Sequence, residues 1–165
     1  MREFDLNGLR LAEYQAKLFE ASVDRFNCST AIFLRRFLHS DLLETLDKNN
    51  SAILNLYVPD GLDSIEEQFG PSNYGKVKFS KDSLFWIGYL YRYISYTRDI
   101  STRVLFKTFS YTKLNELYYV YHTQDIEWAI SNILQLHNLT EDFFDKNYRL
   151  KKFMYEYYFK NNKVE

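Results

Sequence analysis

Residues with the chemistry of a protein-binding surface concentrate between positions 86 and 99, in the stretch WIGYLYRYISYTRD. Tyrosine, tryptophan and arginine are the residue types most enriched at the energetic centres of protein–protein interfaces. Tyrosine rings are also common in protein cores, where each buried ring sends its hydroxyl to a polar partner or to the surface. The core interpretation is the more ordinary one, and the exposed interpretation is the functional hypothesis. The exposed interpretation predicts a partner-binding surface that comprises Arg92, Tyr93, Tyr96, Arg98, Tyr121 and His122.

A second candidate surface is basic and lies near the C-terminus. The stretch KNYRLKKFMYEYYFKNNK, residues 146–163, interleaves lysine and arginine with aromatic rings, a pattern that can follow phosphates while the rings stack on bases. A terminal amphipathic helix with a basic solvent face has the same pattern, and the preceding EDFFD offsets part of the charge, so a terminal helix is the favoured interpretation. The nucleic-acid alternative adds the basic pair in FLRRF, and its residues are Arg35, Arg36, Arg149, Lys151 and Lys152.

Residues with catalytic chemistry are few. Cys28 would act as a nucleophile only with a histidine that the fold brings near, and a structural cysteine is the favoured interpretation. His122 precedes Asp125 in YHTQD, so a carboxylate could orient its imidazole, and an enzyme for a small substrate would use His122 and a tyrosine as acid and base. The same residues serve equally well as the entry to a helix. We therefore expect a non-catalytic protein, with an enzyme centred on His122 as an alternative.

The sequence carries no metal or cofactor motif. Its 3 histidines show neither the His-x-x-x-His nor the Glu-x-x-His spacing that places metal ligands on one face of a helix. A glycine-rich phosphate loop is also missing from the sequence. We therefore expect no metal and no cofactor.

The charge balance limits the classes of partner and the compartment. With 21 basic and 22 acidic side chains the formal net charge is -1, so no overall field draws the chain to nucleic acid or to an anionic membrane. A protein partner is favoured over nucleic acid, and the oligomeric state stays open. The N-terminus MREFDLNGLRLAEYQ lacks the apolar core of a signal peptide, and no run approaches the ~18 apolar residues of a membrane span. A single cysteine fits a reducing compartment, so we expect a cytoplasmic location and no membrane partner.

Composition and punctuation favour a mainly α fold, with residues 1–165 forming one compact multi-helix domain. A chain of 165 residues has the size of one domain. Its 5 glycines and 2 prolines are few for a sandwich or barrel, in which turns recur about every 8–12 residues. Amphipathic spacing and capping residues predict the helices. We expect them at 8–25, 31–47 with a break near His39 and Ser40, 63–70, 81–98, 102–110, 112–121, 124–137 and 141–160.

The helix expected over 81–98 differs from the others because it has almost no polar face. From Leu84 to Tyr96 the residues are apolar or aromatic nearly all round the helical wheel, which predicts a central helix wrapped by the others. A strand is the alternative, because aromatic residues suit strands as well. Gly88 lies inside this run, and it predicts that another backbone passes close to it.

The stretch from 51 to 80 has the weakest helical signal. In SAILNLYVPDG, Pro59 and the Asp60–Gly61 pair are residues that stop a helix, and β-branched and aromatic residues precede them. This pattern favours irregular structure or a short strand. Turn residues concentrate in GPSNYGKVKFS, residues 70–80, and predict a long surface loop.

Four stretches of the sequence also resemble a known family. EEQFG, SNYGKVKFS, WIGYLYRY and YHTQD occur in the same order in a family of small bacterial proteins, widespread in Firmicutes, that are labelled uncharacterised or antitoxin. The similarity extends over about residues 30–136. Such proteins are encoded beside small proteins that resemble ADP-ribosyltransferases, so the resemblance implies the neutralising or accessory partner of a co-encoded toxin in a toxin–antitoxin locus. The family has no assigned active site, and the resemblance therefore adds no site residue.

Overall fold

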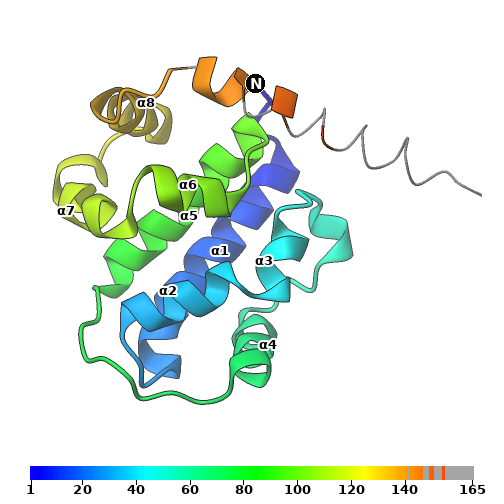
Figure 1. Cartoon of the computed structure of the whole chain (residues 1–165), viewed down its shortest axis with the longest axis vertical. Coiled ribbons are helices and arrows are strands. Elements are labelled where there is room, and N and C mark those ends of the chain that lie inside the picture. The colour runs from blue at the N-terminus through cyan, green and yellow to red at the C-terminus, as the bar shows by residue number, and fades with distance from the viewer. Residues whose placement is uncertain (141, 147–148, 151–153, 155–165) are drawn as a thin grey trace, which may run out of the picture.

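Two long helices that run in opposite directions form the centre of the fold (Figure 1). They are α1, Leu6–Arg25, and α5, Lys81–Arg98, and they pack against each other along their length. The computed structural model describes residues 1–140, 142–146, 149, 150 and 154, and these contain helices and loops but no strand. The mainly α, single-domain prediction is confirmed. The other helices are α2 (Thr30–Leu38), α3 (Asp41–Leu46), the 3-10 turn η1 (Ser51–Ile53), α4 (Val58–Phe69), α6 (Thr102–Thr108), α7 (Tyr111–Tyr121) and α8 (Ile126–Leu136).

The central position predicted for the 81–98 helix is confirmed. α5 is helical rather than extended, and nearly its whole circumference is buried. Its closest neighbour is the backbone of α1, because a Cβ atom at Gly88 would lie 2.9 Å from the carbonyl oxygen of Gln15 and 3.0 Å from Cα of Ala16. A glycine is required at this crossing because any side chain would force the two helices apart.

The remaining helices cover the central pair on two sides (Figure 1). α2 and α4 pack against α1, and α3 contacts both of them. α6, α7 and α8 pack against α5. The first half of the chain therefore surrounds α1, and the second half surrounds α5.

Serine residues begin most of these helices. Ser29 and Ser80 cap α2 and α5, each accepting a hydrogen bond from a free N–H of the first turn. Ser40 caps α3 in the same way, so the break predicted near His39 and Ser40 is confirmed. α8 begins slightly later than predicted, because Asp125 is its cap and accepts from the N–H groups of the two residues that follow Ile126.

The prediction that Pro59 and Asp60–Gly61 stop a helix is wrong, because α4 runs through all three residues. Proline is tolerated in the first turn of a helix, where its missing N–H would have no partner in any case. Gly61 faces α1 so closely that a Cβ atom there would overlap the hydroxyl of Tyr14. Tight packing against α1 therefore outweighs the poor helical propensity of the Pro-Asp-Gly sequence.

The loop predicted at 70–80 is confirmed, and it is fixed to the start of α2. The backbone N–H groups of Ser29 and Thr30 donate to the carbonyl oxygens of Tyr74 and Val77, both over 3.0 Å. Nζ of Lys78 donates to two carbonyl oxygens at the end of α1, over 2.6 Å each. The loop thus satisfies polar groups that the ends of α1 and α2 would otherwise leave open.

The helix predicted at 141–160 falls mainly outside the described residues, so its extent stays a prediction. Within the described part of the chain, no helix combines the length and the apolar character needed to cross a membrane. This finding agrees with the absence of an apolar span in the sequence.

Candidate protein-binding surface

Arg92, the first residue of the predicted surface, is completely buried at the centre of the molecule. Its Nε and Nη2 atoms donate to Oε1 of Gln15 over 2.9 and 2.8 Å, and Nη2 also donates to Oγ1 of Thr102 over 3.1 Å. Its Nη1 atom donates to Oδ1 of Asp47 over 3.0 Å. Burial lowers the pKa of Arg92, and the Asp47 carboxylate opposes this effect. The guanidinium is a paired structural cation, so the prediction that it contacts a partner is wrong.

The residues around Arg92 are themselves held by further hydrogen bonds. The Asp47 carboxylate accepts from the hydroxyls of Ser101 and Thr102 over 3.0 and 2.8 Å. Nε2 of Gln15 donates to the carbonyl oxygen of Gly88 over 3.0 Å. This buried network joins α1, α5, the end of α3 and the start of α6, and its role is structural.

Tyr93 and Tyr96 are buried as well, with 6% and 0% of their surface exposed. The hydroxyl of Tyr96 donates to Oδ1 of Asp5 over 2.7 Å and accepts from Nδ2 of Asn7 over 3.0 Å. The hydroxyl of Tyr93 donates to Oε1 of Glu127 over 2.9 Å. The exposed interpretation is therefore wrong for both rings, because each ring packs in the core and sends only its hydroxyl outward.

The other three residues of the predicted surface lie in two places. Arg98 is half-buried at the end of α5, where its guanidinium contacts Met1 and lies 5.6 Å from the centre of the Phe144 ring. Tyr121 ends α7 and is half-buried, and His122 follows it and is exposed. Of the six predicted residues, only these last two join an exposed aromatic group.

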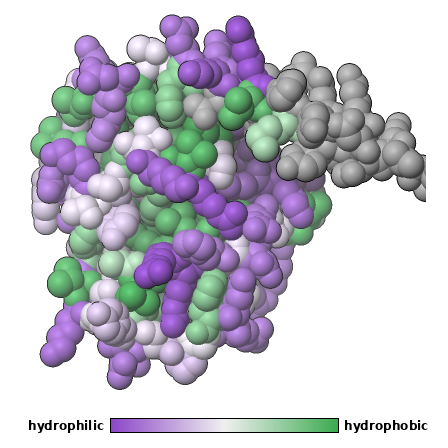
Figure 2. Space-filling view, viewed as in Figure 1, coloured by the Kyte–Doolittle hydropathy of each residue, from purple (hydrophilic) through white to green (hydrophobic). Residues whose placement is uncertain are grey.

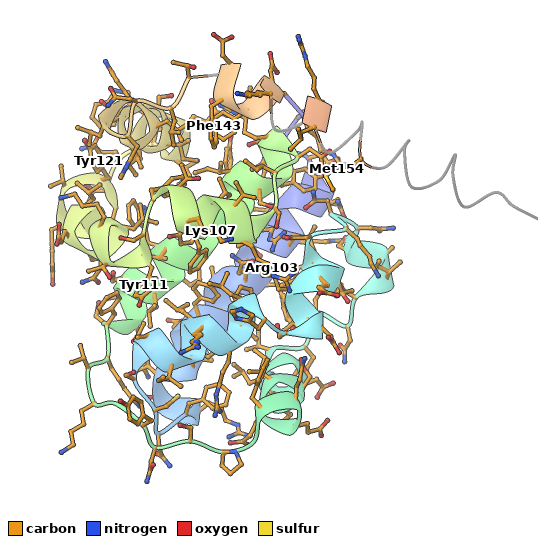
Figure 3. The ribbon with its side chains drawn as sticks, viewed as in Figure 1. Arg103, Lys107, Tyr111, Tyr121, Phe143 and Met154 are labelled. Atoms are coloured by element: carbon orange, nitrogen blue, oxygen red, sulfur yellow. The ribbon has the colours of Figure 1, made fainter. Side chains whose placement is uncertain are left out.

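An exposed aromatic surface does exist where α7 meets α8. The side chains that form it, named the α7–α8 aromatic surface from here on, are Tyr118, Tyr119, Tyr121, His122 and Trp128. Tyr118 stacks on His122 with ring centres 4.3 Å apart and meets Tyr119 at 5.3 Å. Tyr121 contacts Trp128 at 5.9 Å, and Figure 3 shows Tyr121 at the corner between the two helices.

The helical period of α7 and α8 leaves Tyr119 and Trp128 exposed, whereas Tyr118 and Tyr121 are half-buried against the core. On α7, Leu114 is buried and the residues three, four and seven positions later turn to the same inner side. Tyr119 lies off that stripe and is 80% exposed. On α8, Trp128 is 52% exposed although the two residues that follow it are buried. The helical spacing of residues 112–121 is visible in the sequence and could have identified Tyr119 as an exposed residue. The spacing around Trp128 instead indicates a buried residue, so the sequence gives no signal for its exposure.

The face that carries α6 and α8 is mixed in character. Figure 2 shows green apolar residues on this face separated by purple hydrophilic ones rather than gathered in one continuous area. Arg103 and Lys107 lie on α6 in the middle of the same view (Figure 3). This face therefore differs from the large, purely apolar contact area of an obligate dimer.

His122 does not stand in an enclosed catalytic pocket. Its side chain is exposed, and its Nδ1 atom lies 2.7 Å from the carbonyl oxygen of Tyr118, one turn back on α7. The Asp125 carboxylate, which would have oriented the imidazole, instead caps α8. These contacts are structural, and they supply neither a buried acid nor a buried base for the enzyme alternative.

Cys28 is buried, with 3% of its surface exposed, which agrees with a structural role. Throughout the residues that the model describes, no group of three or more histidine, cysteine, aspartate and glutamate side chains is arranged to hold a metal ion.

The basic residues of the nucleic-acid alternative lie apart in the chain and make different contacts. Arg35 is exposed, whereas Arg36 is half-buried and its Nη1 atom donates to the carbonyl oxygen of Gly70 over 2.6 Å. Arg149 is exposed. Lys151 and Lys152 lie outside the described residues, so the predicted basic face is described only in part.

Comparison with known proteins adds no relative. None of the protein-family models, curated proteins or solved structures compared with this chain matches it.

Proposed function

We propose that this chain is a non-catalytic protein-binding module that acts in the cytoplasm and contacts its partner through the α7–α8 aromatic surface. The partner that best fits the sequence resemblance is a co-encoded toxin, which this chain would neutralise by direct binding in the manner of an antitoxin. The observation that carries the proposal is the exposure of large rings, with Tyr119 at 80% and Trp128 at 52%. Rings of this kind are costly to leave in water and are typical anchors of protein interfaces.

Two further features support a binding role for this surface. Its rings contact one another in two sets, Tyr118 with Tyr119 and His122, and Tyr121 with Trp128, so a partner would meet pre-ordered rings that lose little side-chain freedom on binding. The two helices that carry it are packed on α5 rather than on a flexible segment. A rigid surface with aromatic anchors is suited to specific binding at a modest contact area.

The test begins with the tagged chain expressed together with its genomic neighbours, followed by affinity capture, mass spectrometry and a growth assay of each neighbour alone. We expect one neighbour to co-purify in stoichiometric amount and to inhibit growth when this chain is absent. The double substitution Tyr119→Ala and Trp128→Ala should weaken binding by at least about 30-fold, since the loss of even one central aromatic anchor costs about 2 kcal/mol or more.

A matched control is available elsewhere on the surface. Tyr57 and Tyr74 are 60% and 74% exposed but lie on the α4 side of the molecule and in the 70–80 loop. Their double substitution by alanine removes the same amount of exposed aromatic surface and should leave binding unchanged. Equal losses from both double variants, or capture of no neighbour at all, would count against the proposal.

A further inference from the structure

An open depression borders the α7–α8 aromatic surface on the α1 side. It has a volume of about 430 Å³ and lies where α7 meets the first half of α5 and α1. Two carboxylates and four rings line it, and this aromatic–acidic pocket comprises Glu20, Asp82, Phe85, Trp86, Tyr118 and His122. Tyr118 and His122 belong to both regions, so the pocket and the aromatic surface are continuous.

The rings of the pocket form a packed wall. Tyr118 stands between Trp86, which it meets edge to face at 5.9 Å, and His122, on which it stacks at 4.3 Å. Trp86 is only 8% exposed, so its indole is held in the core and contributes a small part of its surface to the pocket. Phe85 is half-buried on the same side of α5. The rings therefore pack on one another, and of the four only His122 is exposed, while Tyr118 and Phe85 are half-buried.

The two carboxylates of the pocket are available for a ligand. In the described chain, neither Glu20 nor Asp82 forms an ion pair with a lysine or arginine. Lys81, next to Asp82 in the chain, has its ammonium group bound to Asp24, and the charge of Glu20 also raises the pKa of Lys81 after the larger effect of Asp24. Asp82 and Tyr118 line the same pocket, and partial burial and then the charge of Asp82 raise the pKa of Tyr118. Because Lys81 is one cation beside the three carboxylates of Glu20, Asp24 and Asp82, the pocket mouth keeps an excess of negative charge beside its aromatic rings.

We infer that the aromatic–acidic pocket binds an arginine side chain of the protein partner. The inference rests on the proposed function and names the group that the partner supplies. A cation over an aromatic face is attracted by the negative charge of the ring, and a guanidinium also stacks flat on such a face and donates to carboxylates as a fork. Because the pocket is open and continuous with the α7–α8 aromatic surface, it suits a side chain on a docked protein rather than a small molecule enclosed on all sides.

The pocket can be tested without the partner by a small probe. N-acetyl-arginine amide carries the guanidinium without terminal charges, and N-acetyl-citrulline amide is its neutral isostere. The chain has 2 tryptophans, so in a ¹⁵N–¹H spectrum the indole signal that persists in the Trp128→Phe variant belongs to Trp86. We expect the arginine probe to shift the Trp86 signal in a saturable way and the citrulline probe to leave it unchanged.

The carboxylates provide the second part of the test. The double variant Glu20→Gln and Asp82→Asn removes both charges but keeps the side-chain shapes, and it should weaken binding of the arginine probe by about fivefold or more. The matched control is Glu3→Gln with Glu67→Gln, two exposed residues outside the pocket, which changes the net charge equally and should have no effect. Thermal unfolding of each variant verifies that the fold is kept.

The outcomes separate this inference from the proposed function. No saturable shift with the arginine probe, an equal shift with citrulline, or an unchanged affinity in the Glu20→Gln and Asp82→Asn variant overturns the inference. If the partner is still captured by that variant with full affinity, the proposed function stands and the pocket assignment falls. If the probe binds as expected but no neighbouring protein is captured, the pocket stands and the proposed function falls.

Discussion

Oδ1 of Asp47 accepts a hydrogen bond from Nη1 of Arg92 over 3.0 Å, between residues 45 positions apart in the sequence. Arg92 is completely buried, and the Asp47 side chain is 19% exposed at the edge of the core. Burying a guanidinium without a counter-ion would cost much free energy, and the Asp47 carboxylate offsets this cost for Arg92. The pair therefore fixes how the end of α3 meets α5 and α6.

Replacing Asp47 by asparagine should destabilise the fold by about 3–5 kcal/mol, because the guanidinium would remain buried without its counter-ion. Denaturant-induced unfolding followed by circular dichroism measures the change. The comparison variant is Glu116→Gln, which breaks the exposed pair with Lys113 and should cost less than about 1 kcal/mol. Similar losses in the two variants would show that the buried pair is not needed for stability.

Replacing Gly88 by alanine should lower stability by about 1–3 kcal/mol, although alanine favours a helix by about 1 kcal/mol over glycine. The new Cβ atom would lie 2.9 Å from the carbonyl oxygen of Gln15, which belongs to a backbone that cannot rotate away. Ser131→Ala on the exposed side of α8 serves as the control and should leave the melting temperature nearly unchanged. A stabilised Gly88→Ala variant would contradict the close crossing of α1 and α5.

Replacing Tyr14 by phenylalanine should keep or raise stability, by up to about 1 kcal/mol. The Tyr14 hydroxyl is buried and has no hydrogen-bond partner in the described structure, so its removal relieves an unfavourable burial. Tyr96→Phe is the opposite case, because that hydroxyl bonds to Asp5 and Asn7, and its loss should cost about 1–2 kcal/mol. Chemical denaturation of both variants gives the comparison, and a clear loss in Tyr14→Phe would mean that its hydroxyl is bound.

Stability should fall in alkaline solution, and the same tyrosine contributes to this fall together with other buried tyrosines such as Tyr91. Burial, and then the charge of Asp60, raise the pKa of Tyr14 from its ordinary value of 10.0 to about 12 in the folded chain. The unfolded chain releases this proton at the lower value, so the contribution of neutral Tyr14 is complete below pH 10 and is lost as the pH rises towards 12. The unfolding free energy of Tyr14→Phe should therefore decrease less steeply across this range. An identical slope in both proteins would show that another group causes the loss.

Much of the architecture was predictable from local patterns. Ser29 and Ser80 start helices because a serine hydroxyl accepts from the free N–H groups of a first turn, whatever the rest of the chain does. Gly88 marked a close backbone approach inside an otherwise continuous apolar helix. The exception was α4, where Pro59 and Gly61 lie inside the helix because contact with α1 outweighs their local preference.

Only part of the candidate site could be predicted from the sequence. Periodicity separates inside from outside only when a helix has a polar face, and α5 has almost none, so its rings and Arg92 looked equally able to reach solvent. Their burial depends on partners such as Asp47 and Gln15, which lie far away in the sequence. Tyr121 and His122 were identified, but Trp86, Glu20 and Asp82, which line the pocket beside His122, come from other helices.

The amino-acid sequence by itself determined the helical class, the single domain, the starts of most helices and the central place of α5, since these follow from short-range hydrogen bonds and apolar spacing. Only the tertiary structure decided which aromatic rings are buried and which two regions meet at the aromatic–acidic pocket. The physical reason is that exposure is a property of packed neighbours, and those neighbours are chosen by the fold as a whole rather than by any local stretch of chain.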